Sequence, residues 1–184
     1  MRVLLISGSL RSGSANSAML RTAFEVAPEP IEPMAFSGLG RLPHFNPDDD
    51  FDPLPPPVVG LRAAIELSDA VLFCTPEYAG ALPGAFKNLL EWTVGGTEMY
   101  RRPVGWINVA GGGRGAATHE QLRSVLGYVN AEIVETACSR IPVARSQIGP
   151  DGRIEDEEIR ERLAALLSAL AAHVTADPRE EIAA

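Results

Sequence analysis

The sequence has little basic character. Its 184 residues include 16 lysines and arginines against 24 aspartates and glutamates, which gives a formal net charge of −8. Binding to nucleic acid requires a basic face that neutralises phosphates, so no nucleic-acid partner is expected. From Asp151 onward the chain holds nine acidic and four basic residues. We interpret this acidic segment as the solvated face of a helix.

Cysteine and histidine are scarce. Cys74 and Cys138 form no C-x-x-C pair, and His44, His119 and His173 fit no ligand spacing, so no metal site is predicted. The two cysteines are predicted to be buried free thiols in a reducing compartment.

Long apolar runs and several catalytic motifs are missing as well. No stretch approaches the ~20 residues that span a bilayer, and the first apolar run is too short for a secretion signal. We therefore expect a cytoplasmic protein without a membrane partner. The pattern G-x-x-x-x-G-K-S/T is absent, which argues against nucleoside triphosphate hydrolysis. The absence of G-x-S-x-G argues against an α/β-hydrolase.

What the sequence does contain is a regular alternation of apolar runs and amphipathic segments. Apolar runs predict strands over residues 3–7, 31–36, 70–74, 104–110 and 132–136. Helical spacing predicts helices over residues 19–27, 58–68, 86–93, 116–128 and 159–174. We predict one α/β domain over residues 1–184, a doubly wound sheet of five parallel strands with helices on both faces. Residues from about 176 to 184 are predicted to form a flexible tail.

Ligands of such sheets bind beyond the carboxyl ends of the strands, where the strand order reverses. The first loop at this edge runs from Gly8 to Ser17 and carries four hydroxyls, Arg11 and Asn16 just before a predicted helix. Free N–H groups, a positive dipole end and a guanidinium favour an anion, in particular a phosphate. A helix cap is the alternative explanation for Ser14 or Asn16 alone.

Two further loops follow buried strands at the same edge. The loop from Thr75 to Asn88 is rich in proline and glycine, and Tyr78 offers a flat apolar face with a polar tip. The loop from Gly111 to Ala116 fits G-x-G-x-x-A, with acidic residues about 20 positions on. A Rossmann protein that binds NAD(P) is therefore one alternative, although that fingerprint normally opens the first strand-turn-helix unit.

Taken together, the three loops resemble those of the NADPH-dependent FMN reductases, a flavodoxin-like family that includes quinone, azo-dye and chromate reductases. The first matching pattern is Gly8-Ser9-x-Arg11-x-x-Ser14-x-Asn16. The second is Thr75-Pro76-Glu77-Tyr78-x-Gly80-x-x-Pro83-Gly84-x-x-Lys87-Asn88, followed by Glu91-Trp92. The third is the glycine cluster after the fourth strand.

The resemblance implies a flavodoxin-like fold that holds FMN. By the family pattern, the phosphate would be bound by Ser9, Arg11, Ser14, Asn16 and Ser17. The isoalloxazine ring would be lined by Pro76, Glu77, Tyr78, Ala79 and Gly80, and approached from its other side by Gly112 and Gly113. No side chain is expected to act as a catalyst, because the flavin carries the hydride.

The activity implied by the resemblance is transfer of hydride from NADPH or NADH through FMN to a small acceptor. Acceptors in the family are quinones, free flavin, azo dyes or metal oxyanions, and ping-pong kinetics are expected. A homodimer or homotetramer is implied, with Glu77 and Lys87 near the subunit contact. A non-enzymatic flavodoxin-type electron carrier and a flavin-less sensing domain remain alternatives. Arg11 counts against the carrier, because flavodoxins typically have a Ser/Thr-rich phosphate loop without this arginine.

The sequence departs from the family pattern at three places. Position 79 is commonly asparagine and here is Ala79, which we expect to alter flavin affinity or potential by removing a side-chain donor. The usual aspartate before the tryptophan is Glu91. The segment 37–57 is long and acidic at Asp48–Asp50, and is expected to shape the substrate entrance.

Overall fold

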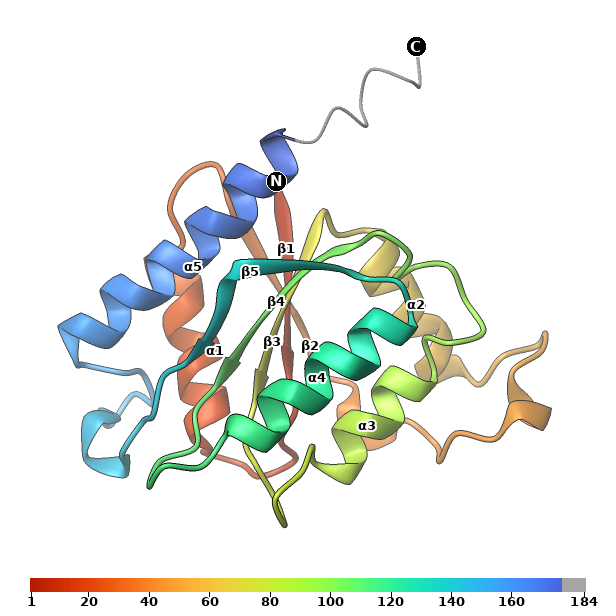
Figure 1. Ribbon diagram of the computed structural model, residues 1–184, viewed down its shortest axis with the longest axis horizontal. Helices are drawn as coiled ribbons and strands as arrows, with labels where there is room; N and C mark the ends of the chain where they lie inside the picture. Colours follow the sequence, from red (N-terminus) through yellow and green to blue (C-terminus); the bar gives the residue numbers. More distant parts are fainter. Residues whose placement is uncertain (177–184) are drawn as a thin grey trace.

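A five-stranded sheet forms the centre of the structure, a computed structural model that describes residues 1–176 (Figure 1). The strands are β1 (Arg2–Ser7), β2 (Glu32–Phe36), β3 (Ala70–Thr75), β4 (Pro103–Asn108) and β5 (Glu132–Arg140). All neighbouring strands are parallel, in the order β2-β1-β3-β4-β5. The predicted sheet is thus confirmed, with the strand order of flavodoxin-like folds. The predicted flexible tail lies outside the described residues beyond position 176.

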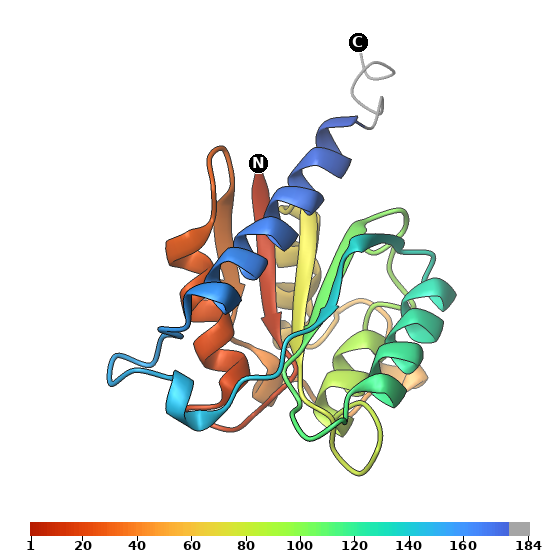
Figure 2. The same cartoon turned by 60° about the vertical axis from the view of Figure 1, so that its left-hand side comes forward.

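Within the described residues, five α-helices cover the two faces of the sheet. They are α1 (Ala15–Val26), α2 (Pro56–Glu66), α3 (Gly84–Glu91), α4 (Ala116–Tyr128) and α5 (Glu157–Ala176). Figures 1 and 2 show α1 and α5 on one face and α2, α3 and α4 on the other, so the prediction that helices cover both faces is confirmed. None of the helices within residues 1–176 is long and apolar enough to cross a membrane.

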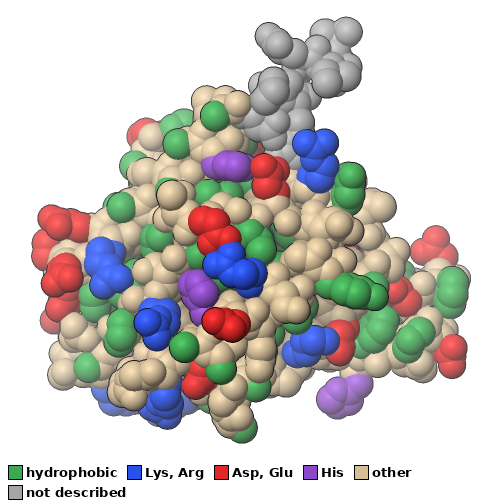
Figure 3. Space-filling view, viewed as in Figure 1, with side chains coloured by type: hydrophobic (Ala, Val, Ile, Leu, Met, Phe, Trp, Pro, Cys, Tyr) green, Lys and Arg blue, Asp and Glu red, His purple; other side chains and the backbone are tan. Residues whose placement is uncertain are grey.

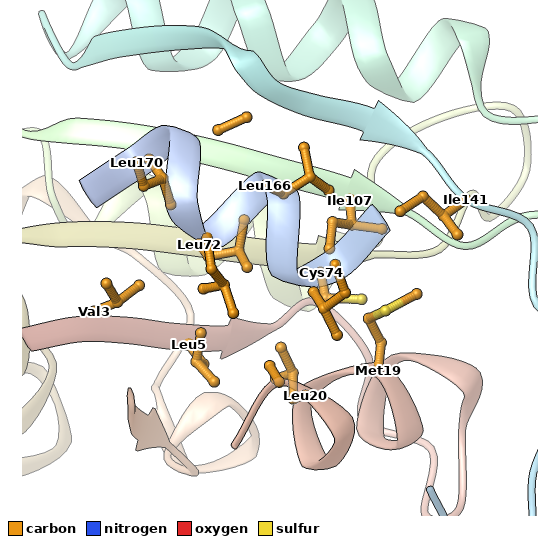
Figure 4. Packing of buried hydrophobic residues seen from close by; sticks show 14 of the residues in the cluster. Val3, Leu5, Met19, Leu20, Leu72, Cys74, Ile107, Ile141, Leu166 and Leu170 are labelled. Carbon is orange, nitrogen blue, oxygen red and sulfur yellow. The ribbon is translucent and has the colours of Figure 1, made fainter. Parts of the chain in front are cut away.

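The core has two halves because alternate residues of each central strand face opposite helical layers. Val3 and Leu5 of β1 belong to the cluster that contains α1 and α5, whereas Leu4 and Ile6 belong to the cluster under α2, α3 and α4. Figure 4 shows the first cluster from close by, with residues of β1, β3 and β4 packed against helix side chains. Burying each such side chain contributes about 1.5–3 kcal/mol. Because both faces of β1, β3 and β4 are covered, these three strands are largely apolar runs.

Strand β5 is longer than the sequence pattern indicates. We predicted residues 132–136, which is wrong at the carboxyl end, since β5 continues to Arg140. Val104 pairs with Ile133 and Trp106 pairs with Cys138, so two steps along β4 match five steps along β5. This irregularity interrupts the alternation of apolar and polar residues on an edge strand, which hid the second half of the strand.

The segment 37–57 contains two short 3-10 turns, Leu39–Arg41 and Pro47–Asp49, and is fastened to α3. The Asn88 side chain accepts a hydrogen bond from the N–H of Phe45 at 2.7 Å and donates one to the carbonyl of Pro43 at 2.8 Å. The Trp92 indole N–H donates to the same carbonyl at 2.8 Å. Asn88 and Trp92, which belong to the family-like pattern, therefore hold segment 37–57 in place and make none of these bonds to the candidate ligand loops.

Candidate functional site

A cavity of about 310 Å³ lies at the carboxyl edge of the sheet, which is the lower edge in Figure 1. It is lined by residues that follow four different strands. They are Arg11, Gly13, Ser14, Ala15, Asn16, Pro76, Glu77, Tyr78, Val109, Ala110, Gly111, Arg114, Val143, Arg145 and Ile148. This is the edge at which the strand order reverses between β1 and β3, and the volume is within the range of small-molecule sites.

The loop after β1 brings the start of α1 to the cavity. The N–H of Gly8 donates to the carbonyl of Cys74 at 2.8 Å, and a Cβ at position 8 would lie 2.9 Å from Phe86, so glycine is required there. Ser14 caps α1, since its hydroxyl accepts a hydrogen bond from the N–H of Ser17 at 3.1 Å. The first turn of α1 contains no acidic residue. Its positive dipole end and first-turn N–H groups therefore remain suited to an anion.

Asn16 is fixed between this loop and the sheet. It is buried, and its Oδ1 accepts a hydrogen bond from the thiol of Cys74 at 3.4 Å. Burial raises the pKa of the Cys74 thiol, and burial is also the main cause that raises the pKa of Cys138 to about 12. Both free thiols therefore stay protonated at neutral pH, and neither lines the cavity.

The carboxylate of Glu77 links the loop after β3 to the start of α4. Its Oε2 accepts hydrogen bonds from the N–H of Gly115 at 2.9 Å and from the N–H and hydroxyl of Thr118 at 3.3 and 3.2 Å. Gly115 itself has φ of 104°, and a Cβ there would lie 2.6 Å from Oδ1 of Asn108. Glu77 therefore lines the cavity, and its carboxylate also caps the start of α4. The family resemblance did not imply this capping role.

Tyr78, Ala79, Gly80 and Ala81 form a tight turn at the mouth of the cavity. Tyr78 and Ala81 exchange two backbone hydrogen bonds of 3.1 and 3.0 Å. Ala79 has φ of 52° and Gly80 has φ of 73°, which are the signs of a type I′ turn. Such a turn favours Asn-Gly, because asparagine tolerates the left-handed conformation. Ala79 therefore has a conformational consequence besides the loss of a side-chain donor.

The loop after β4 provides the remaining wall. The buried Asn108 accepts a hydrogen bond from the N–H of Ala110 at 2.9 Å. Gly111 lines the cavity, while Gly112 and Gly113 are exposed beside it with φ of 67° and 75°. Arg114 lines the cavity and donates through Nε to the carbonyl of Gly111 at 3.1 Å.

The predicted site residues fall into two groups. Those that line the cavity are Arg11, Ser14, Asn16, Pro76, Glu77 and Tyr78. Those that lie in the same loops but outside the lining are Ser9, Ser17, Ala79, Gly80, Gly112 and Gly113. Of the second group, Ser9 contacts the hydroxyl of Tyr78 at 3.3 Å and so connects the first two loops. The assignment of all twelve to FMN stays a prediction.

Sequence reasoning missed the contribution of the chain beyond β5. Val143, Arg145 and Ile148 line the cavity, and no local motif indicated them. Val109 and Ala110 were also missed. Gly111 and Arg114 belong to the candidate loop Gly111–Ala116, but neither was assigned to FMN.

The lining fits a ligand that joins a phosphate to a planar ring. Three arginines and the start of α1 surround the cavity, which suits a phosphate, and Pro76, Val109 and Val143 offer apolar surface for a ring. The residues present therefore fit FMN. Within residues 1–176, no three His, Cys, Asp or Glu side chains are grouped as they would be around a metal ion.

Comparison with known proteins extends this result. A model of the family described as NADPH-dependent FMN reductase matches residues 1–144. A probable NADPH:quinone oxidoreductase from Oryza sativa subsp. japonica is 32% identical over 181 residues, covering 94% of this chain and 88% of its own length. An NAD(P)H-dependent FMN reductase from Pseudomonas aeruginosa is 32% identical over 173 residues, covering 92% and 93% of the two chains.

A solved structure agrees with these relatives. The flavoenzyme NAD(P)H:(acceptor) oxidoreductase FerB from Paracoccus denitrificans superposes with a TM-score of 0.80 at 28% identity, over 94% of this chain and 98% of that one.

Replacing Ala79 by asparagine is expected to stabilise the protein. The type I′ turn holds position 79 at positive φ, where a non-glycine residue is disfavoured by roughly 1–2 kcal/mol and asparagine is tolerated. We expect Ala79→Asn to raise the free energy of unfolding by about 0.5–1 kcal/mol in urea titrations. Ala81→Asn, at the end of the same turn but without positive φ, is the control. Equal effects of the two substitutions would contradict the conformational explanation.

Proposed function

This chain belongs to the NADPH-dependent FMN reductase family, and we propose that it reduces a small acceptor with hydride taken from NADPH or NADH through FMN held in the cavity described above. The resemblance predicted from the three loops is confirmed, as are the oxidoreductase class and FMN as cofactor. One observation supports this location above others. The fold brings Arg11, Ser14 and Asn16 into one cavity with Pro76 and Tyr78, although 60 positions separate Asn16 from Pro76.

The alternatives considered from the sequence lose their support. The curated relatives are named as a quinone oxidoreductase and an FMN reductase, which favours an enzyme over an electron carrier or a flavin-less sensing domain. A Rossmann protein typically has the strand order 3-2-1-4-5-6, whereas this sheet has the order β2-β1-β3-β4-β5.

The residues of the cavity would bind and orient FMN rather than react with substrate. We propose that Arg11, Ser14 and Asn16, with Ser9 and Ser17, hold the phosphate. The ring would lie against Pro76, Glu77, Tyr78, Ala79 and Gly80, with Gly112 and Gly113 on its other side. When bound, FMN supplies the capacity to accept and donate hydride, and the protein supplies position and electrostatics. The Glu77 carboxylate is engaged at α4, so it is not proposed as an acid or base.

We propose that the nicotinamide and the acceptor use the same opening in turn. Tyr78 is 48% exposed beside the cavity and offers an aromatic face to a planar substrate. Quinones come first among the acceptors, because the curated relatives include quinone oxidoreductases, and free flavin, azo dyes and metal oxyanions are the other candidates. Alternate use of one opening implies ping-pong kinetics.

Anaerobic spectroscopy of the FMN-loaded protein tests the proposed function. Addition of NADPH, and separately of NADH, is expected to bleach the oxidised flavin absorption, and a quinone is expected to restore it. Steady-state rates at several quinone concentrations should then give parallel double-reciprocal lines. Failure of both nucleotides to reduce the bound flavin would refute the reductase proposal, whereas intersecting lines would refute only the ping-pong order.

Arg11→Gln tests the phosphate loop. A lost charge-assisted hydrogen bond costs about 1.5–3 kcal/mol, so FMN affinity is expected to fall roughly 10- to 100-fold. The dissociation constant is measured by titrating apo-protein with FMN and following flavin fluorescence. Arg41→Gln, an exposed arginine outside the cavity lining, is the control. If Arg11→Gln binds FMN as tightly as the control, the assignment of this loop is wrong.

We also propose that the chain forms a homodimer, alone or within a tetramer, through the face made by α3 and α4. A hollow of about 230 Å³ between the two helices is lined by Lys87, Leu90, Val94 and Tyr128 among others. Val94 is 50% exposed and Tyr128 is 80% exposed, and Figure 3 shows hydrophobic side chains among charged ones on this side of the molecule. Exposed apolar surface of this kind suits a second copy of the chain.

Sedimentation equilibrium of wild type and Tyr128→Asp tests this surface. We expect an oligomer for the wild type and a lower association state for the variant, because a charge would be buried in the interface. Phe24→Asp introduces the same charge at an exposed aromatic residue on α1, on the other face of the sheet, and should leave association unchanged. A monomeric wild type, or equal effects of both substitutions, would exclude this interface.

A further inference from the structure

Arg145 reaches the candidate FMN cavity from a segment that the family model does not cover. The family match ends at residue 144, and Arg145 opens the short 3-10 turn Arg145–Gln147 directly after it. Arg145 nevertheless lines the same cavity as Arg11, together with its neighbours Val143 and Ile148. The cavity therefore includes a cation that the family pattern does not assign.

Backbone and side-chain contacts fix this segment against the sheet and α1. The N–H groups of Ile141 and Val143 donate to the carbonyls of Asn108 and Val109 at 2.9 and 3.3 Å, which continues the course of β5 past the end of β4. Val143 and Ile148 also pack against the core cluster that includes residues of α1.

The following residues complete the attachment to α1. Ile148 pairs with Ile154 in an isolated bridge, and the N–H of Ile154 donates to the hydroxyl of Thr22 in α1 at 2.9 Å. The Gln147 side chain accepts from the N–H of Ala144 at 2.8 Å and donates to Asp156 at 2.8 Å. Figures 1 and 2 both show this light-blue turn beside the end of α1 at which the helix begins. The turn that begins with Arg145 therefore lies beside the start of α1, where the cavity is suited to an anion.

The charges around Arg145 are unbalanced. Within residues 1–176, the side chains of Arg11 and Arg145 have no ion pair or hydrogen bond, whereas Arg62 and Arg160 are paired with carboxylates. The first turn of α1 carries no acidic residue that would offset them. Because both guanidinium groups line one cavity and neither is engaged by a carboxylate, they are available to an anion from outside the chain.

We propose that Arg145 is a second binding residue for the phosphate of FMN, acting together with Arg11 from a separate segment of the chain. This inference rests on the proposed function, since it assumes that FMN occupies the cavity. A guanidinium donates two parallel hydrogen bonds to phosphate, so a second arginine adds affinity for the phosphate and none for the ring. The consequence is selectivity for FMN over riboflavin, which has the same ring and no phosphate.

Flavin titrations of Arg145→Gln test the proposal without depending on activity. Apo-protein is titrated with FMN and with riboflavin, and each dissociation constant is measured from flavin fluorescence. We expect the FMN constant to rise roughly 10- to 100-fold, as for loss of one hydrogen bond to a charged group, while the riboflavin constant changes less than about twofold. Arg145→Lys should restore part of the FMN affinity, and Arg41→Gln should change neither constant.

The outcomes separate this inference from the proposed function. If the wild type binds FMN more tightly than riboflavin and Arg145→Gln keeps that ratio, the inference is overturned and the FMN site stands. A variant that loses both flavins equally also overturns it, because the effect then lies in the fold or the ring site. An altered KM for NADPH with unchanged FMN binding overturns it too and assigns Arg145 to the nucleotide phosphate. A wild type that binds no flavin refutes the proposed function itself.

Discussion

The geometry of the candidate site depends on the carboxylate of Glu77. One of its oxygens accepts three hydrogen bonds from Gly115 and Thr118, so the loop after β3 and the start of α4 are held at a fixed separation. Helices usually receive this stabilisation from a Ser, Thr, Asp or Asn at the N-cap. Here the N-cap is Gly115, which has no side chain to offer, and the buried Asn108 leaves no room for one. Glu77, Gly115 and Asn108 are therefore mutually dependent. The loops after β3 and β4, which form two walls of the cavity, depend on all three residues.

The parts of the fold that the sequence predicted best are those where physical constraints act locally. Strands β1, β3 and β4 are covered on both faces, so nearly every residue is apolar and the strand ends lie within one or two residues of the predicted positions. Strand β5 lies at the edge, alternates in exposure and changes register between Val104 and Trp106, so only its first half was recognisable. No strand and no helix was predicted between residues 37 and 57, where the structure has two short 3-10 turns before α2 begins at Pro56. The attachment of this segment to Asn88 and Trp92 depends on tertiary contacts that no local pattern encodes.

In the candidate site, too, some features follow from the sequence and topology and others depend on tertiary contacts. Topology alone indicated that the loops after β1, β3 and β4 meet, because parallel strands present their carboxyl ends at one edge. The conformation of Ala79 was not predictable from its residue type, since alanine seldom adopts positive φ and only the Tyr78–Ala81 turn imposes it. The segment 143–148 was missed for another reason. Its approach to the cavity depends on how far β5 extends and on a contact with Thr22, more than 100 positions earlier in the chain.

The distribution of charge explains how an acidic chain can present a site for a phosphate. Net charge excluded a basic face for nucleic acid, but it does not determine the potential inside one cavity. Many of the acidic side chains are engaged elsewhere: Asp50 pairs with Arg62, Glu135 with Arg123, and Glu25 with Arg160. Around the cavity the balance is reversed, since three arginines line it and the carboxylate of Glu77 is neutralised in part by the N-terminus of α4. The net negative charge of the chain disfavours anion binding on most of the surface, whereas the arginines at this edge favour it. A phosphate is therefore directed to the cavity.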